Sequence, residues 1–253
     1  KKFIKLVLPI TKRIESFFNF FNSWNSYKKK YLDSRKKSLD KKIFVALATI
    51  FFTVITYFLL PSFYDKNKIK NQLKNQIFQQ YNFEVKLDKN LNYGLFPRPH
   101  FSVEDVKIQY DSEIISNSKN TKFFISNENF FIFNEIKVKN IVFSETDFKI
   151  NVPNFNFFLN LLNNKIDHEN IRFIKSKLFY LDQNDNVIFF TNLKNLIYLN
   201  QEKFLNKLVS KLEVFNLPIN LEAKNDIIKK KIFTEIYFNS LKLKITNNFN
   251  YNK

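Results

Sequence analysis

The residues of this chain best suited to acid–base or metal chemistry are two histidines. His100 lies in the sequence PRPHF, where the prolines predict a turn, and His168 lies in the polar sequence Asp-His-Glu. A zinc site needs several His, Cys or carboxylate ligands at regular spacing, and neither histidine has a second one at such a spacing. We therefore interpret both as polar surface residues.

Carboxylates offer no stronger site. Asp182, Asn184 and Asn186 resemble the opening of a calcium loop, but Val187 replaces the required Gly and Leu193 replaces the terminal Glu, so a β-hairpin turn is expected instead. The chain has no Cys and a single Gly, which excludes disulfides, thiolate nucleophiles and Gly-rich phosphate loops. The sequence predicts no enzyme, and no catalytic, cofactor-binding or metal-binding residue.

An uncharged run from Ile43 to Leu60 predicts a transmembrane helix. Eighteen residues form a helix of roughly 27 Å, close to the ~30 Å hydrocarbon core of a bilayer. Thr49, Thr53 and Thr56 interrupt the apolar run, and their hydroxyls can bond to helix carbonyls. The predicted anchor residues are Ile43, Phe44, Leu47, Ile50, Phe51, Val54, Ile55, Phe58 and Leu59.

Basic residues gather on the N-terminal side of that run. Residues 1–42 hold thirteen Lys or Arg and three Asp or Glu, whereas the net charge of the whole chain is +18. This asymmetry predicts a cytoplasmic arm over 1–42 and a far-side domain over 61–253. Charge beside the anchor suits anionic lipid headgroups, so no nucleic acid is expected as a partner. The residues that carry this prediction are Lys28, Lys29, Lys30, Arg35, Lys36, Lys37, Lys41 and Lys42.

The elements around the anchor differ in periodicity. Aromatic residues at three- and four-residue steps predict an interfacial helix within 1–27, a disordered arm or a helix docked on a partner being the alternatives. Asp65 is expected to cap an amphipathic helix of about four turns. From residue 83 onward apolar and polar residues alternate, which predicts a mainly antiparallel, half-buried sheet and an α+β fold. Helices are expected over 155–162 and 202–212, and a loop over 112–122.

The stretch from the anchor to Tyr110 resembles the N-terminus of the AsmA family of bacterial inner-membrane proteins. A transmembrane helix, a second helix and a strand precede a Leu-Phe-Pro element and a Val-x-Asp-Val-x-Ile strand. The residues that match are Leu95, Phe96, Pro97, Val106 and Ile108. The family usually has Gly where this chain has Asn82 and Lys89-Asn90.

The resemblance implies a single-pass bacterial inner-membrane protein whose C-terminal domain is periplasmic. It implies a role in outer-membrane assembly or phospholipid transport between membranes, with membrane lipids as partners and an open, groove-like sheet shielding acyl chains. The residues proposed to face lipid are Phe83, Val85, Leu87, Phe101 and Val103. Two alternatives remain open: the same sheet face packs into an ordinary closed core, or the domain docks an envelope protein partner.

Overall fold

The computed structural model describes residues 34–126, 136–163, 170–202 and 205–250. The chain divides into two units, residues 1–57 and 58–253. The predicted interfacial helix within 1–27, Lys28–Lys30 and His168 lie outside the described residues.

The predicted anchor is helical. Helix α2 (Ser34–Leu59) continues into a short 3-10 helix, η1 (Leu60–Phe63), and residues Lys42–Phe63 are long and apolar enough to cross a membrane. The Thr49 and Thr53 hydroxyls donate to the carbonyls of Val45 and Thr49, both at 2.8 Å, as the sequence predicted. The most apolar part of this segment is not buried in the protein, whereas Pro61 near its end is buried, and the nine anchor residues lie along it. By length and composition it is a candidate for a single span, and its orientation stays a prediction.

Helix α3 (Lys66–Tyr81) confirms the expected second helix. The Asp65 carboxylate accepts from the backbone N–H groups of Asn67 and Lys68, which satisfies two donors of the first turn. At the other end Asn82 adopts the left-handed conformation (φ 55°), a position usually taken by Gly.

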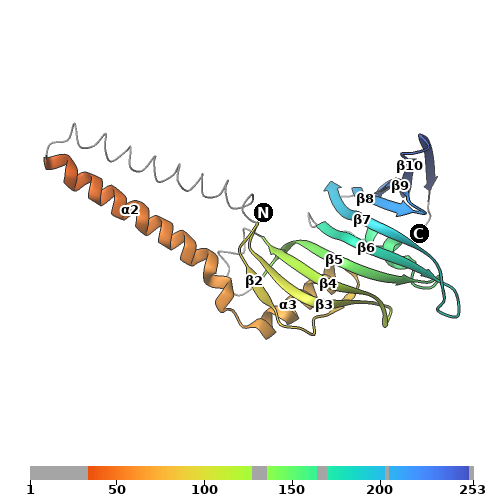
Figure 1. Cartoon of the computed structure of the whole chain (residues 1–253), viewed down its shortest axis with the longest axis horizontal. Helices are drawn as coiled ribbons and strands as arrows, with labels where there is room; N and C mark the ends of the chain where they lie inside the picture. The colour runs from red at the N-terminus through yellow and green to blue at the C-terminus, as the bar shows by residue number, and fades with distance from the viewer. Residues whose placement is uncertain (1–33, 127–135, 164–169, 203–204, 251–253) are drawn as a thin grey trace, which may run out of the picture. The chain divides into compact units, whose positions relative to one another are not determined.

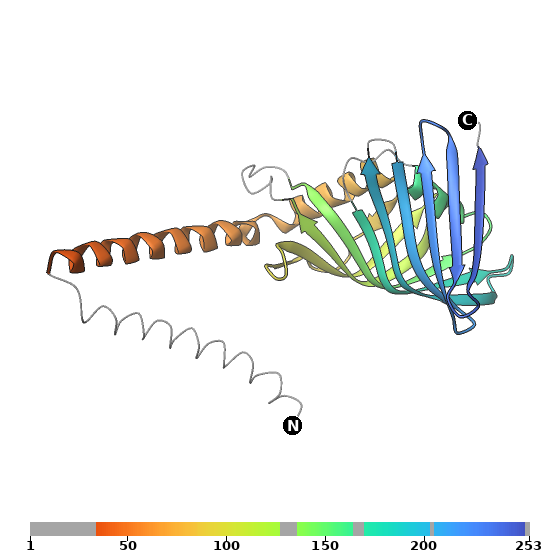
Figure 2. The ribbon, with the colours of Figure 1, turned by 90° about the horizontal axis from the view of Figure 1, so that it is seen from above.

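The rest of the unit is one mixed sheet of eleven strands with a short helix, α4 (Asn156–Asn163), on the crossover between β5 and β6 (Figures 1 and 2). Neighbours are antiparallel except β5 and β6, which run parallel. The sheet order is β1-β3-β4-β5-β6-β7-β8-β9-β10-β11, with β2 on β3. The strands are β1 (Glu84–Lys86), β2 (Asn92–Gly94), β3 (His100–Tyr110), β4 (Glu113–Ile125), β5 (Val138–Ile150), β6 (Asn170–Leu181), β7 (Val187–Glu202), β8 (Leu205–Val214), β9 (Leu217–Asp226), β10 (Lys231–Phe238) and β11 (Leu243–Asn250).

We call the sheet face that carries the core the inner face. Phe157 of α4 contacts the rings of Phe83, Tyr110 and Phe148, with centroids 5.4–6.1 Å apart. The apolar stripe of α3 belongs to the same core and comprises Ile69, Leu73, Ile77 and Tyr81. Both helices therefore cover the first half of the inner face.

This packing corrects the proposed lipid-facing residues. Each of the five is at most 3 % exposed and belongs to the closed core: Phe83, Val85, Leu87, Phe101 and Val103. Their alternation places them on the inner face of the sheet, but helices α3 and α4 already cover that part of the face. The matched residues Val106 and Ile108 are buried in the same core.

Two predicted elements are wrong. The expected loop over 112–122 is most of β4, which looks polar because Ser116, Ser118 and Thr121 are among its buried residues. The expected helix over 202–212 overlaps β8, whose Leu205, Leu208 and Leu212 also fit a helical spacing. The helix expected over 155–162 is confirmed as α4.

A line of irregular pairing crosses β3 to β7. Along a regular strand every second side chain points to the inner face. At this line each strand has one extra residue, so two successive buried residues lie three positions apart instead of two, as Phe143 and Thr146 do. Across this line the register between neighbouring strands is unchanged from β3 to β7. Between β7 and β8 the register shifts by one residue at the line. The extra outward residue is charged in every strand: Asp105, Lys119, Glu145, Lys175 and Lys194.

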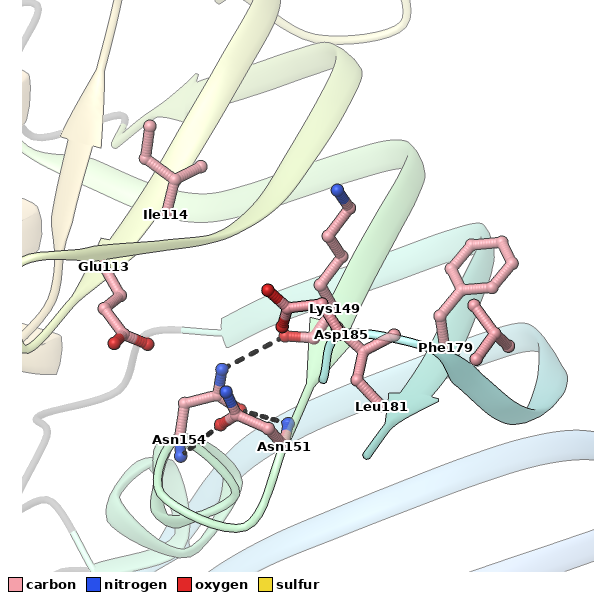
Figure 3. Close-up of a pocket in the computed structure, with 9 residues that line it drawn as sticks. Glu113, Ile114, Lys149, Asn151, Asn154, Phe179, Leu181 and Asp185 are labelled. Carbon is pink, nitrogen blue, oxygen red and sulfur yellow. Dashed lines mark hydrogen bonds between the residues drawn. The ribbon is translucent and has the colours of Figure 1, made fainter. Parts of the chain in front are cut away.

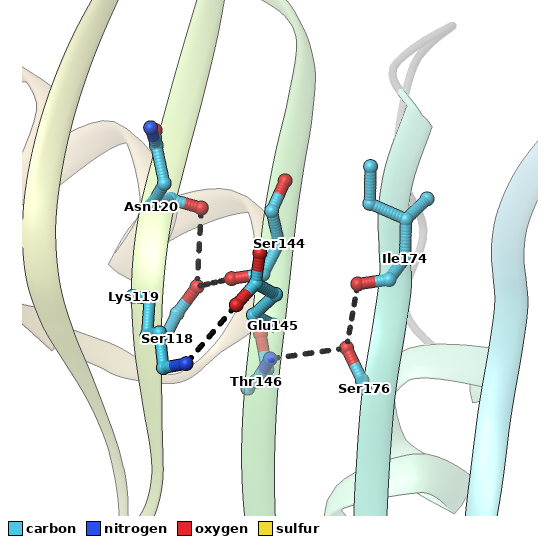
Figure 4. A network of polar contacts seen from close by, with 8 residues as sticks. All are labelled: Ser118, Lys119, Asn120, Ser144, Glu145, Thr146, Ile174 and Ser176. Carbon is cyan, nitrogen blue, oxygen red and sulfur yellow. Dashed lines mark hydrogen bonds and ion pairs between the residues drawn. The ribbon is translucent and has the colours of Figure 1, made fainter.

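Hydroxyl groups bond the backbone along this line (Figure 4). Ser118 Oγ donates to the carbonyls of Asn120 and Ser144 at 3.2 and 3.1 Å. Ser176 Oγ accepts from the Thr146 N–H at 3.2 Å and donates to the Ile174 carbonyl at 3.1 Å. Small buried hydroxyls thus replace ladder bonds that the irregular pairing leaves out.

Candidate functional site

The inner face stays open over the second half of the sheet. A hollow of about 370 Å³ lies there, which we call the groove, and its lining comes from β5 to β11 and from α4. Tyr180, Thr191, Ser210 and Thr234 are the polar members of an otherwise apolar lining. The apolar members include Phe158, Leu159, Leu196, Leu208, Leu212, Leu221, Ile232 and Phe249.

The far wall of the groove is the most exposed part of the sheet. On β11, Leu243, Ile245 and Phe249 are 47, 46 and 42 % exposed, and they pair with Phe238, Ile236 and Ile232 of β10. Alternation places these three on the inner face, because Ile232 and Phe249 line the groove. Among the described residues no element covers this apolar face, and an exposed apolar face is typical of a binding surface.

Two buried asparagines fix α4 at the border of the groove. Asn206 Nδ2 and Asn225 Nδ2 donate to the carbonyl of Leu162, at 2.8 and 3.2 Å, and Asn225 Nδ2 also donates to Asn163 Oδ1 at 2.8 Å. These bonds satisfy a carbonyl at the C-terminal end of the helix and tie it to β8 and β9. Leu159 on the exposed side of α4 and Phe155 just before the helix then contribute to the groove.

A second hollow, of about 590 Å³, is lined by both polar and apolar side chains (Figure 3). Lys149, Glu113 and Asp185 line it, and its floor is built by Asn151 and Asn154. These two asparagines bond reciprocally: each backbone N–H donates to the side-chain oxygen of the other, at 2.9 and 3.0 Å. These two hydrogen bonds stabilise the turn before α4, so the two asparagines have a structural role that requires no ligand in the hollow.

His100 is not a surface residue, which corrects the sequence interpretation. Its side chain is buried, its ring contacts that of Phe124 at a tilt with centroids 5.3 Å apart, and Nδ1 lies 2.7 Å from the Arg98 carbonyl. A Cβ on Gly94 would lie 2.8 Å from His100 Cε1, so the single Gly of the chain makes room for this ring. The histidine holds the segment between β2 and β3 in place.

Asp182 and the two carboxylates of the irregular line also have structural partners. Asp182 Oδ1 accepts from the N–H groups of Asn184 and Asn186, both at 2.8 Å, which lowers the pKa of Asp182 and confirms the predicted hairpin turn. Asp105 pairs with Lys89 at 2.7 Å, and Glu145 pairs with Lys119 at 3.1 Å. Within the described ranges, no group of three or more His, Asp or Glu could hold a metal ion.

Sequence reasoning missed the groove residues because their signal is shared with core strands. Leu217, Ile219 and Leu221 were recognised as a half-buried strand, as were Leu241, Leu243 and Ile245. Alternation alone cannot show whether a helix covers the apolar side. The informative feature is the length of the connections between strands. Strands β7 to β11 follow each other through short connections, which are too short to contain a covering helix.

The other predicted residues lie apart from the groove. Leu95, Phe96 and Pro97 lie between β2 and β3, and Arg35, Lys36, Lys37, Lys41 and Lys42 lie in α2. Comparisons of the chain with protein-family models, with curated protein sequences and with solved structures give no match. The fold and site therefore define only a class: an apolar helix able to span a membrane, followed by a large open β-sheet with an apolar groove.

Proposed function

We propose that this chain is a membrane-anchored, non-catalytic envelope protein that binds lipid acyl chains in the groove. The supporting observation is the almost wholly apolar lining of an uncovered sheet face, in a chain with a candidate membrane span. Each methylene moved from water into such a lining contributes ~0.8 kcal/mol. The resemblance to the AsmA family extends the proposal to outer-membrane assembly or phospholipid transport from the bacterial inner membrane.

The groove has a suitable length for one acyl chain. From β7 to β11 there are four inter-strand steps of about 4.8 Å, which gives roughly 19 Å along the sheet. One leaflet of a bilayer contributes about half of the ~30 Å hydrocarbon core, so a single chain extends ~15 Å. A chain lying across the strands would thus contact all of β7 to β11.

The experiment is mass spectrometry of lipids that remain with the full chain after extraction in mild detergent and extensive exchange. The proposal predicts retained phospholipid that cross-links to a photoreactive acyl chain at groove residues. Retained lipid without such cross-links would be annular lipid and would contradict the proposal. Recovery of a lipid-free chain in stable complex with an envelope protein would favour the partner-docking alternative.

A further inference from the structure

Residue 58 connects the folded unit to the apolar helix. Phe58 is the first residue of the unit 58–253 and also belongs to the candidate span Lys42–Phe63. Tyr93 Oη on β2 donates to the Phe58 carbonyl at 2.6 Å, and burial raises the pKa of Tyr93 to about 12. Phe58 is five residues from the C-terminal end of this span, so Tyr93 lies near that end and toward the membrane interface, where Tyr and Trp are enriched.

The loop 95–99 follows directly after β2. Phe96 is 87 % exposed, and its Cα is within about 11 Å of the Tyr93 Cα because the two residues are three positions apart in the sequence. Phe63, at the end of the candidate span, is 84 % exposed. Two of the most exposed aromatic side chains of the described unit therefore lie near the same end of the anchor.

Two arginines meet beside this loop. The sequence has arginine only at positions 13, 35, 98 and 172, and the last two line one hollow of about 370 Å³ on the outer face. Arg172 Nε donates to Asn195 Oδ1 at 2.7 Å, which orients the guanidinium. No carboxylate lines the hollow, and neither arginine has a carboxylate partner among the described residues.

The chemistry of this hollow fits a phosphate group. Guanidinium groups bind phosphate through paired hydrogen bonds, and the side-chain amides of Asn140 and Asn170 in the lining supply further donors. Pro97 and Pro99 restrict the backbone on both sides of Arg98, and His100 holds its carbonyl. The loop is thus held in place before any ligand binds.

We propose that the loop 95–99 inserts Phe96 into the interface of the anchoring membrane, where Arg98 and Arg172 bind a phospholipid phosphate. This inference rests on the membrane anchoring in the proposed function but not on the groove. It assigns the Leu-Phe-Pro segment a second lipid contact, made with headgroups of the bilayer surface.

The test uses the absence of cysteine from the sequence. Phe96→Cys gives one site for a nitroxide spin label in the full chain, reconstituted in nanodiscs of phosphatidylcholine with phosphatidylglycerol. The matched control is Phe215→Cys, 82 % exposed in the turn between β8 and β9 at the opposite strand end. The ratio of collision rates with oxygen and with a water-soluble nickel chelate is expected to be several-fold higher at 96 than at 215. Equal ratios would overturn the inference.

The arginines are tested in the same nanodiscs. Both lipids carry a phosphate, but in phosphatidylcholine the choline cation of the same headgroup neutralises it. The ratio at 96 is therefore expected to rise as phosphatidylglycerol replaces phosphatidylcholine, and Arg98→Gln with Arg172→Gln should abolish this rise. The charge-matched control, Lys149→Gln with Lys175→Gln, should retain it, because both lysines lie outside the hollow. A rise unaffected by the arginine changes, or no rise at all, would contradict a phosphate site.

The groove can be assayed separately by mass spectrometry on the same preparations. A water-exposed label at 96, in a chain that still retains acyl chains in the groove, would overturn this inference alone. An interfacial label in a chain with an empty groove would overturn the groove proposal alone.

Discussion

Leu212→Asp is expected to remove most of the affinity of the groove for an acyl chain. Leu212 faces the groove from β8, the central one of its seven lining strands, where it pairs with Leu193 and Ile219. If about eight methylenes of a bound chain contact the lining, their burial contributes roughly 6 kcal/mol. A carboxylate at this position must stay hydrated, so the part of the chain on one side of it, taken as about half of the eight methylenes, loses contact.

The loss is therefore about 3 kcal/mol, which corresponds to a roughly 150-fold weaker affinity. Leu212 is only half-buried, so the fold is expected to survive the change. The assay is a titration of the detergent-exchanged full chain with a fluorescent fatty acid, in parallel with circular dichroism.

The matched control is Val209→Asp, on the same strand but pointing to the outer face and half-buried as well. It should leave the fatty-acid affinity within about twofold of the parent. Equal losses in both variants, or an unchanged affinity in Leu212→Asp with an intact fold, would refute the reasoning.

Three further predictions concern the fold, each read from the thermal unfolding midpoint of the sheet. Thr146→Val is expected to be neutral or stabilising by up to about 1 kcal/mol, because the buried Thr146 hydroxyl has no partner among the described residues. Ser176→Ala should instead cost about 1–2 kcal/mol, because it removes two hydrogen bonds. A larger loss of stability in Thr146→Val than in Ser176→Ala would contradict the bonding in the irregular line. Gly94→Ala should cost about 1–3 kcal/mol through the clash with His100, whereas no change would show that the ring moves freely. Hydrogen bonds from Lys207 and Lys224 lower the pKa of Glu222. The stabilising contribution of the Glu222 carboxylate is therefore present above the usual glutamate pKa near 4.5 and is lost as the pH falls through the lowered pKa. The difference in unfolding midpoint between the parent and Glu222→Gln should shrink on acidification, and a constant difference would argue against the ion pairs of Glu222 with the two lysines.

Periodicity alone was enough for the elements with one dominant pattern. The apolar helix, the cap at Asp65, α3, α4 and the hairpin turn at Asp182 were predicted from local residue types, and the structure has them. The polar strand β4 and the Leu-rich strand β8 were missed because their composition mimics a loop and a helix. Which strands a helix covers depends on tertiary packing, so Phe83 and Phe101 were assigned to lipid although α3 and α4 cover the core they occupy.

The groove and the arginine hollow required the sheet topology. Leu212 and Phe249 are 37 residues apart in sequence and share one lining only because four strands follow in spatial order. Arg98 and Arg172 meet because β4 and β5 lie between β3 and β6. Neither pairing leaves a local pattern that a single sequence could reveal.

The charged line across β3 to β7 constrains which length changes the domain can accept. Deleting Glu145 alone would exchange the two sides of β5 from that point onward, so Phe148 would point to water and Lys149 into the core. Only removal of the corresponding residue from all five strands would preserve the pairing. Insertions and deletions in this region should thus be tolerated in the turns but not within individual strands.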